Sequence, residues 1–307
     1  MIYLDYNATT PVAPEVARAM QPFLGLEFGN PSSDYPLGLR AAEAMGQARR
    51  EVAALLNCAP EEIVFTGGAT EANNTVLKGV ALGRGGGRII TAAGEHPSVL
   101  APCRFLESRG FSLTVLPVDG EGRVDPDDLR RALSPDTILI SIMVGNNETG
   151  ALQPLTELAA VARKAGVLLH TDAAQGVGKV KVDLSKLPVD FLTVAGHKFY
   201  APKGVGALFV RRGRESALTP LLHGASQEGG RRAGTENIPY LVALGEACRL
   251  VREGGAAAGA AHLKELRDLL WVRLQSGFPG LSLNGPETER LPNTLNVSFT
   301  GISGGEL

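Results

Sequence analysis

The sequence predicts an α/β protein with a mainly parallel, mixed sheet flanked by helices, and a partial smaller α+β domain. Short apolar segments such as 137–144 and 190–194 alternate with helical patterns, as buried parallel strands do. Glycine and proline are frequent, with 38 and 19 residues, which is typical of many tight turns between strands and helices. Near residue 251 the alternation ends, and an amphipathic helix at 262–275 and a strand at 294–300 form a separate pattern.

The elements are expected in a simple order along the chain. Residues 1–14 are extended, and Pro14 suits the first turn of the helix that comes next. Asp125 and Pro126 are typical of a helix start, and Gly166 is typical of a helix end. Strands are expected at 62–66, 88–91, 112–116, 137–144, 167–171, 190–194 and 206–210. Helices are expected at 15–24, 39–56, from residue 70, and at 97–108, 125–133, 155–165 and 241–251.

We expect three parts in the chain. Residues 1–14 form an N-terminal extended segment that joins the small domain, residues 15–250 form the large domain, and residues 251–307 form an incomplete C-terminal small domain. Ser303 and Glu306 have capping-box spacing, so a helix is expected to start where the sequence stops. A strand and a helix start are too little for an independent domain. We therefore expect a C-terminally truncated chain, with a flexible natural terminus as the alternative.

Composition and charge argue against several classes of protein. The net charge of −2 gives no electrostatic reason to bind nucleic acid or an anionic membrane. No apolar run reaches the roughly 18 to 20 residues of a membrane span, and the N-terminus lacks the pattern of a signal peptide. Three scattered cysteines lack zinc-site spacing and fit a reducing compartment. We expect a cytoplasmic protein without metal, nucleic acid or membrane partner.

Two polar residues follow apolar strands in the second half of the chain. Lys198 comes after the strand at 190–194, where a lysine held out of water has a lowered pKa and a nucleophilic amine. Asp172 directly follows the strand at 167–171. A lysine that binds an aldehyde, together with an acid that keeps a pyridine nitrogen protonated, fits pyridoxal phosphate. A surface lysine and a helix-capping aspartate are the alternative for each residue alone, but the pair favours the cofactor.

A glycine-rich turn offers a site for the phosphate of such a cofactor. Gly67, Gly68, Ala69 and Thr70 lie between an expected strand and the helix that follows it. Backbone N–H groups at a helix N-terminus bind anions, and the Thr70 hydroxyl adds a donor. Such turns are common and a helix cap explains Thr70 equally, so the motif alone is weak evidence.

Eight motifs occur in order along nearly the whole chain. They lie at 3–11, 29–33, 66–74, 95–96, 146–150, 171–175, 196–198 and 232–237. Together they resemble the cysteine desulfurase and selenocysteine lyase family, whose members are class-V aminotransferase-like pyridoxal-phosphate enzymes of fold type I. The resemblance implies the fold-type I architecture, with pyridoxal 5'-phosphate bound in the large domain.

The resemblance also implies roles for individual residues. Lys198 would be the catalytic lysine that binds the cofactor and shuttles protons at the α-carbon of the substrate. His96 would lie flat on the pyridine ring and serve in acid–base catalysis. Asp172 would pair with the pyridine nitrogen and Gln175 would bond the phenolic oxygen. Asn147 would act near that oxygen or near the substrate.

The phosphate would be held by Ala69, Thr70 and His197. Thr235 would reach the phosphate from the partner subunit, so the active site would need a homodimer. Many family members have serine at the position of Ala195, and one phosphate hydrogen bond worth about 1 to 2 kcal/mol should therefore be missing. Selenocysteine lyases tend to be apolar there, which favours selenocysteine as substrate without deciding it.

A desulfurase also needs a thiolate on a mobile loop. Cys58 lies at a helix end, and Cys103 and Cys248 lie within expected helices, where a small core residue is the more common role. The resemblance implies that the Gly/Ser-rich cysteine loop and the arginine for the substrate carboxylate would come after residue 307.

The resemblance implies a cysteine desulfurase, which removes sulfur from L-cysteine to give L-alanine and an enzyme-bound persulfide. The sulfur would pass to an acceptor protein, as in iron–sulfur cluster biosynthesis. One alternative is a selenocysteine lyase that acts on L-selenocysteine. Others are an aminotransferase or β-eliminating lyase of the same fold type, and a catalytically incomplete cofactor-binding fragment.

Overall fold

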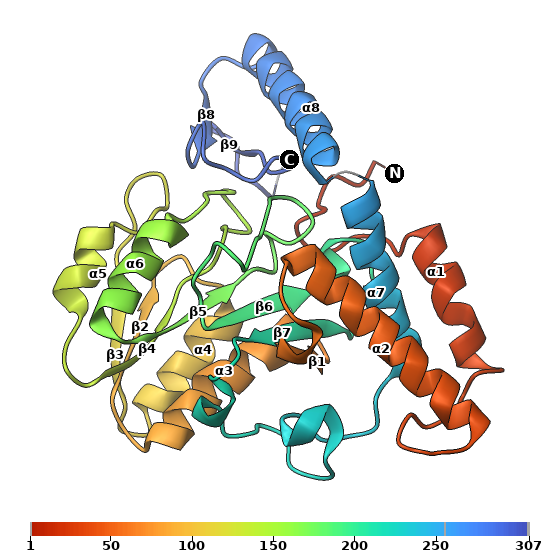
Figure 1. Ribbon diagram of the computed structural model, residues 1–307. Coiled ribbons are helices and arrows are strands. Elements are labelled where there is room, and N and C mark those ends of the chain that lie inside the picture. Colours follow the sequence, from red (N-terminus) through yellow and green to blue (C-terminus); the bar gives the residue numbers. More distant parts are fainter. Residues whose placement is uncertain (1, 255, 306–307) are drawn as a thin grey trace.

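The central sheet has seven strands in the order β1–β7–β6–β5–β4–β2–β3 (Figure 1). A computed structural model describes residues 2–254 and 256–305. The strands are β1 (Ile63–Thr66), β2 (Arg88–Ala92), β3 (Ser112–Leu116), β4 (Thr137–Ser141), β5 (Leu168–Asp172), β6 (Phe191–Ala195) and β7 (Gly206–Val210). β7 pairs antiparallel with β1 and β6, and the pairs from β6 to β3 are parallel. The predicted mainly parallel, mixed sheet is confirmed.

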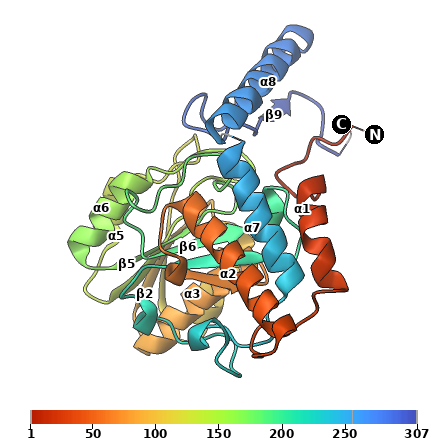
Figure 2. The same cartoon turned by 45° about the vertical axis from the view of Figure 1, so that its right-hand side comes forward.

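Helices cover both faces of this sheet (Figures 1 and 2). They are α1 (Pro14–Met20), α2 (Pro36–Leu56), α3 (Ala69–Arg84), α4 (Pro97–Glu107), α5 (Pro126–Ala132), α6 (Leu155–Ala165) and α7 (Ile238–Glu253). Side chains alternate along the strands, so Val64 and Leu208 pack with α3 and α4. Phe65 and Phe209 belong to the core on the other face, with α2, α5, α6 and α7. Because both faces are buried, the strands are continuously apolar.

Several predicted elements end or begin elsewhere than expected. The helix at 15–24 divides into α1 and the 3-10 helix η1 (Gln21–Leu24), since Pro22 has no N–H to continue an α-helix. β4 ends at Ser141 rather than at residue 144, although Ile142 and Val144 still donate backbone hydrogen bonds to residues of β5. Asp125 caps α5 as predicted, because its carboxylate accepts a bond of 2.8 Å from the N–H of Asp127.

The C-terminal residues lie at one end of the molecule, as Figure 1 shows. They comprise α8 (Ala256–Gly277) and a two-stranded antiparallel sheet of β8 (Leu281–Asn284) and β9 (Asn296–Phe299). The helix begins before residue 262 because alanine, a strong helix former, fills its first turns. β8 was not predicted, and β9 is shorter than 294–300. The expected helix start at Ser303 depends on Glu306, which lies outside the described residues, and the division into three parts stays a prediction.

Candidate active site

The carboxyl ends of β1, β2, β4, β5 and β6 meet at one edge of the sheet, because these strands run in one direction. A cavity of about 1170 Å³ opens at this edge, where ligands of α/β proteins bind. Eight of the nine predicted site residues line it: Ala69, Thr70, His96, Asn147, Asp172, Gln175, His197 and Lys198. The fold thus brings together residues that the sequence separates by up to 129 positions, from Ala69 to Lys198.

Thr235 is the ninth predicted residue, and it lies outside this cavity. Its side chain is exposed and lines a smaller pocket of about 160 Å³, which shares Gly67 and Gly204 with the main cavity. Arg232 of the same loop pairs with Glu71 at 2.8 Å, and Glu71 also accepts a bond of 2.9 Å from the N–H of Gly67. The loop that carries Thr235 is therefore tied to the glycine-rich turn.

Lys198 ends the 3-10 helix η3 (Gly196–Lys198), which directly follows β6. Its Nζ donates hydrogen bonds to the backbone oxygens of Asn7 and Ala8, the latter at 2.9 Å. Burial lowers the pKa of this amine, while the charges of Asp172 and Asp5 oppose the shift. A lowered pKa favours the neutral amine, which is the nucleophilic form of a lysine.

Asp172 is buried at the carboxyl end of β5. Its Oδ2 accepts a bond of 2.7 Å from Nδ2 of Asn73, and its Oδ1 accepts one of 2.9 Å from the N–H of Ala174. Burial raises the pKa of this carboxyl, although both hydrogen bonds and the charge of Lys198 oppose the rise. A protonated ring nitrogen placed here would offset the cost of burial, which fits the pyridine nitrogen of pyridoxal phosphate.

The N-terminus of α3 faces the same cavity. Gly68 has φ +140°, a backbone conformation that residues with a Cβ rarely adopt. The first N–H groups of a helix have no acceptor within it, so Ala69 and Thr70 can donate to an anion. The site therefore fits a phosphate at one end and a pyridine ring with its aldehyde between Asp172 and Lys198.

The remaining polar residues of the cavity are fixed by their neighbours. Nε2 of Gln175 donates to the backbone oxygen of Asn7 at 2.9 Å, and Oε1 of Gln175 accepts from Nζ of Lys179. Nδ1 of His197 lies 3.2 Å from Oγ1 of Thr9. Burial lowers the pKa of His197 to about 4, with the charge of Lys198 adding to the effect. His197 is therefore a neutral ring at physiological pH.

Asn7 is a site residue that the sequence analysis missed. Its Nδ2 donates to the backbone oxygen of Asn147 at 3.1 Å and to Oγ1 of Thr294 at 2.9 Å. Its Oδ1 accepts from Nδ2 of Asn293 at 2.8 Å, and its backbone oxygen accepts from Lys198. The available signal was its place in the motif at 3–11. Asn73, Ser98 and Lys179 were missed as well, because each acts on another side chain of the site.

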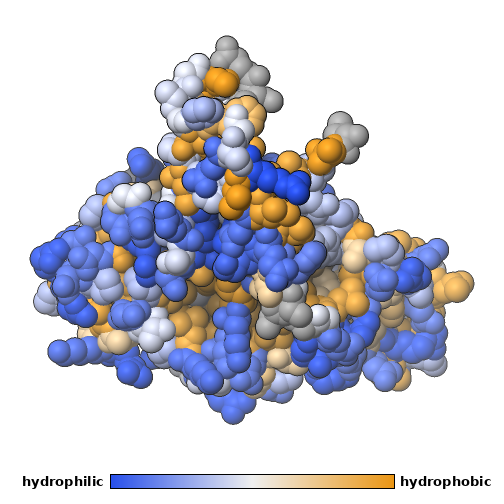
Figure 3. All heavy atoms as spheres, turned by 90° about the horizontal axis from the view of Figure 1, so that it is seen from above, coloured by the Kyte–Doolittle hydropathy of each residue, from blue (hydrophilic) through white to orange (hydrophobic). Residues whose placement is uncertain are grey.

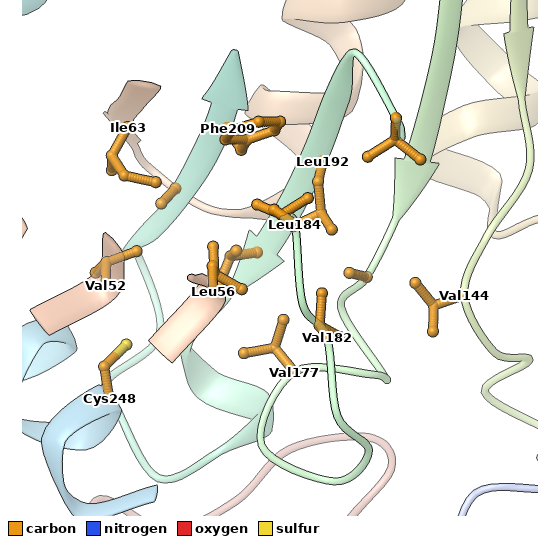
Figure 4. Close-up of a cluster of buried hydrophobic side chains, with 14 of the residues drawn as sticks. Val52, Leu56, Ile63, Val144, Val177, Val182, Leu184, Leu192, Phe209 and Cys248 are labelled. Carbon is orange, nitrogen blue, oxygen red and sulfur yellow. The ribbon is translucent and has the colours of Figure 1, made fainter. Parts of the chain in front are cut away.

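None of the three cysteines, all of which the structure describes, lines the cavity. Burial raises the pKa of Cys58 and of Cys103 to about 12, and it raises the pKa of Cys248 as well. Figure 4 shows Cys248 among apolar side chains such as Val52 and Leu56. Their interpretation as packing residues is confirmed for Cys103 and Cys248, which are buried, and Cys58 is half-buried.

The fold and this cavity define an α/β enzyme of fold type I that is built to hold pyridoxal phosphate. Residues 2–307 match the aminotransferase class-V family. The chain is 47% identical to the cysteine desulfurase IscS of Dictyoglomus turgidum, an alignment that covers 99% of this chain and 77% of the relative. It is 46% identical to the cysteine desulfurase IscS of Methanosarcina thermophila, over 100% of this chain and 75% of the relative. The chain therefore belongs to the cysteine desulfurase family, whose cofactor is pyridoxal 5'-phosphate.

Solved structures agree with this assignment. A NifS-like protein superposes with a TM-score of 0.95 at 39% identity, over 99% of this chain and 83% of that one. SspA in complex with cysteine superposes with a TM-score of 0.90 at 39% identity, over 100% and 85%. The predicted fold type and cofactor are confirmed. Among the described residues, no helix is long and apolar enough to cross a membrane, and no cluster of His, Cys, Asp or Glu is placed to hold a metal.

Proposed function

We propose that this chain uses pyridoxal phosphate to remove the sulfur of L-cysteine and pass it to a thiol. The Cβ–S bond of cysteine breaks, an S–S bond forms to the acceptor, and a proton is added at Cβ, which leaves L-alanine and a persulfide. The observation that carries the proposal is the placement of Lys198 and Asp172 in one cavity, in a chain similar to cysteine desulfurases. We extend it to a cytoplasmic enzyme that delivers sulfur to an acceptor protein.

Two residues supply the acid–base chemistry. Bound pyridoxal phosphate supplies an electron sink beside the α-carbon of the amino acid. Lys198 takes a proton from that α-carbon and returns it, which requires an amine that is not permanently charged. Burial lowers the pKa of Lys198, which favours this neutral form. Asp172 keeps the ring nitrogen protonated, and the donors Asn73 and Ala174 hold its two oxygens in place.

Other residues of the cavity bind and orient. The N-terminus of α3, with Ala69 and Thr70, holds the phosphate together with His197. His96 covers the pyridine ring. Gln175 binds the phenolic oxygen, and Asn147 acts near that oxygen or the substrate.

The proposal includes a homodimer in which Thr235 of the partner subunit completes the phosphate site. Large apolar side chains support it, because they are strongly exposed along one stretch of the surface: Leu24, Leu26, Phe28 and Leu39 are 63%, 82%, 72% and 57% exposed. Figure 3 shows hydrophobic residues at the surface on the side of the molecule where α1 lies. Burying this stretch against a second copy would remove it from water.

L-Selenocysteine is a second candidate substrate. Ala195 lines the cavity with a methyl group, where a hydroxyl would add a donor for the phosphate. A carbon–selenium bond also breaks more readily than a carbon–sulfur bond. Competition between the two amino acids for one enzyme preparation would rank them, and a much higher kcat/KM for selenocysteine would make the lyase the better description.

The test measures alanine and sulfide released from L-cysteine in the presence of dithiothreitol as acceptor thiol. We expect both products in equal amounts from the wild-type chain loaded with pyridoxal phosphate, and neither from Lys198→Ala. Pyruvate and ammonia in place of alanine would point to a β-eliminating lyase. Cofactor binding without any product would support a catalytically incomplete fragment and count against the proposal.

A further inference from the structure

Two residues of the cavity, Asp172 and His96, are joined by a continuous chain of hydrogen bonds. Nδ2 of Asn73 lies 2.7 Å from Oδ2 of Asp172 and 2.9 Å from Oγ of Ser98. Oγ of Ser98 in turn lies 2.8 Å from Nδ1 of His96. Asn73 is fully buried on α3, and Ser98 is buried in the first turn of α4. This series of hydrogen bonds therefore connects the loop after β2 with the end of β5.

The direction of each hydrogen bond follows from the chemistry of its partners. A carboxylate oxygen only accepts, so Nδ2 of Asn73 must face Asp172. The second hydrogen of Nδ2 points to Oγ of Ser98, which accepts it and is left with one hydrogen to donate. That hydrogen goes to Nδ1 of His96. With this orientation Oδ1 of Asn73 faces away from Asp172 and Ser98, and it is buried without a hydrogen-bond partner among residues 2–254 and 256–305.

A second donor reaches the same ring nitrogen. His96 is the N-cap of α4, and its Nδ1 accepts a bond of 3.1 Å from the backbone N–H of Ser98. A backbone N–H can only donate, so Nδ1 carries no proton in this arrangement. The proton of the neutral ring then sits on Nε2, which has no partner within the part of the chain that the structure describes. His96 lines the cavity.

We propose that Asn73 and Ser98 are positioning residues that hold His96 in the tautomer with its proton on Nε2. His96 then offers an N–H donor to the cavity rather than a base. Such a donor stabilises negative charge on the sulfur or carboxylate of a bound amino acid. This consequence rests on the proposed function, whereas the tautomer itself follows from the hydrogen bonds alone. The amide of Asn73 also donates to Asp172. One residue therefore orients the carboxylate of Asp172 directly and the ring of His96 through Ser98.

The experiment reads the tautomer directly by long-range ¹H–¹⁵N NMR of the full chain labelled at histidine, with and without pyridoxal phosphate. The chain has five histidines, and His96→Gln assigns the signals of His96. We expect a pyrrole-type Nε2 and a pyridine-type Nδ1 in the wild type. Ser98→Ala removes the hydroxyl donor and Asn73→Ala frees it from its orienting partner, while the backbone N–H of residue 98 stays on Nδ1. Each variant should therefore raise the population that carries the proton on Nδ1 only in part, and Ser98→Thr, which keeps the hydroxyl, should show the wild-type spectrum.

Asn74→Ala is the matched control, because Asn74 is the next residue on α3 and, within the described ranges, its side chain bonds only to the backbone oxygen of Thr70, at 2.9 Å. It should leave the tautomer unchanged. In the alanine-release assay we expect Ser98→Ala to lower kcat roughly threefold to tenfold, on the scale of one lost hydrogen bond, with KM little changed.

Two results would overturn the proposal. One is a wild-type His96 that carries its proton on Nδ1, and the other is a tautomer ratio that neither Ser98→Ala nor Asn73→Ala alters in a folded chain. The spectra need no substrate, so the result on the tautomer remains valid if the chain releases no alanine. A failure to release alanine would count against the proposed function alone.

Discussion

Lys179 donates a hydrogen bond from its Nζ to Oε1 of Gln175, four residues earlier in the chain. Because Oε1 is turned toward Lys179, Nε2 of Gln175 faces the backbone oxygen of Asn7 at 2.9 Å. Lys179 is buried and does not line the cavity, so it acts on the site through Gln175. Burial lowers its pKa to about 7, and the charge of Lys198 adds to the shift.

This buried lysine makes stability depend on pH. Its pKa is 10.5 in the unfolded chain and about 7 in the folded one, so between these values the unfolded chain binds more protons. The free energy of unfolding should therefore rise with pH, by up to about 1.4 kcal/mol per pH unit from this group. Below pH 7 both states hold the proton and the contribution to the slope vanishes.

We expect Lys179→Met to flatten this rise, as measured by urea unfolding at pH 7 and pH 9. Lys186→Met removes an exposed lysine and serves as control, with the wild-type slope expected. The same slope in Lys179→Met as in the wild type would show that Lys179 does not titrate in this range.

Lys198 should be the lysine that binds the cofactor. The wild-type chain with pyridoxal phosphate is expected to be yellow and to form an adduct that borohydride reduces. Lys198→Ala should abolish this adduct, because the replacement has no amine at the end of η3. Peptide mapping of the reduced protein checks the position. Labelling of Lys203, which also lines the cavity, in place of Lys198 would refute the assignment.

Asp172→Asn should separate cofactor binding from catalysis. The variant keeps the shape of the side chain but cannot hold the ring nitrogen protonated, so exchange of the α-proton should fall by roughly 10²-fold or more. Without cofactor the variant should be at least as stable as the wild type, because burial raises the pKa of Asp172 and ionisation of that carboxyl is costly in the empty site. Deuterium exchange followed by NMR and urea unfolding measure the two effects. Exchange at the wild-type rate would remove Asp172 from its role.

The exposed apolar stretch after α1 should mediate dimer formation. Leu26→Asp and Phe28→Asp place a charge on side chains that are 82% and 72% exposed, so the folded monomer should tolerate them. We expect analytical ultracentrifugation to show a dimer for the wild type and a monomer with weakened cofactor binding for the double variant. Leu82→Asp, at an exposed leucine of α3, is the control and should remain a dimer. A wild-type monomer with full cofactor affinity would contradict the proposed role of Thr235.

The three cysteines should not take part in turnover. Burial keeps their thiols protonated, and none lies in the cavity, so none can approach the substrate sulfur to the roughly 3 to 3.5 Å that attack requires. A chain with Cys58→Ser, Cys103→Ala and Cys248→Ala should release alanine to dithiothreitol at the wild-type rate per folded molecule. Without an added thiol the 307-residue chain should turn over slowly. Loss of activity on replacing one cysteine alone, in a folded chain, would identify that residue as the acceptor.

Lys198, Asp172 and the glycine-rich turn could be predicted from their places at the ends of strands, whereas the family resemblance supplied the other site residues. Continuously apolar strands lie just before Lys198 and end at Asp172, so the pattern predicts polar side chains at an edge of the sheet. Strands that run in one direction have their carboxyl ends at the same edge, so the two side chains are expected to lie together. The glycine-rich turn before α3 is visible in the same way. The boundary of β4 and the strand β8 were not predictable from local pattern, because backbone pairing with distant partners decides them.

The sequence by itself predicted the fold class from its hydrophobic pattern, and it predicted the cofactor from a lysine and an aspartate after two strands together with motifs that resemble a known family. Eight of the nine residues that it singled out line one cavity. The tertiary structure alone decided which residues act through others. The backbone oxygen of Asn7 meets Lys198 across 191 positions, and the amide of Asn73 meets Asp172 across 99. No periodicity relates such pairs, because their distance depends on the packing of the N-terminal segment and of α3 against the sheet edge. The same packing gives each hydrogen bond its direction, and with it the expected protonation of His96.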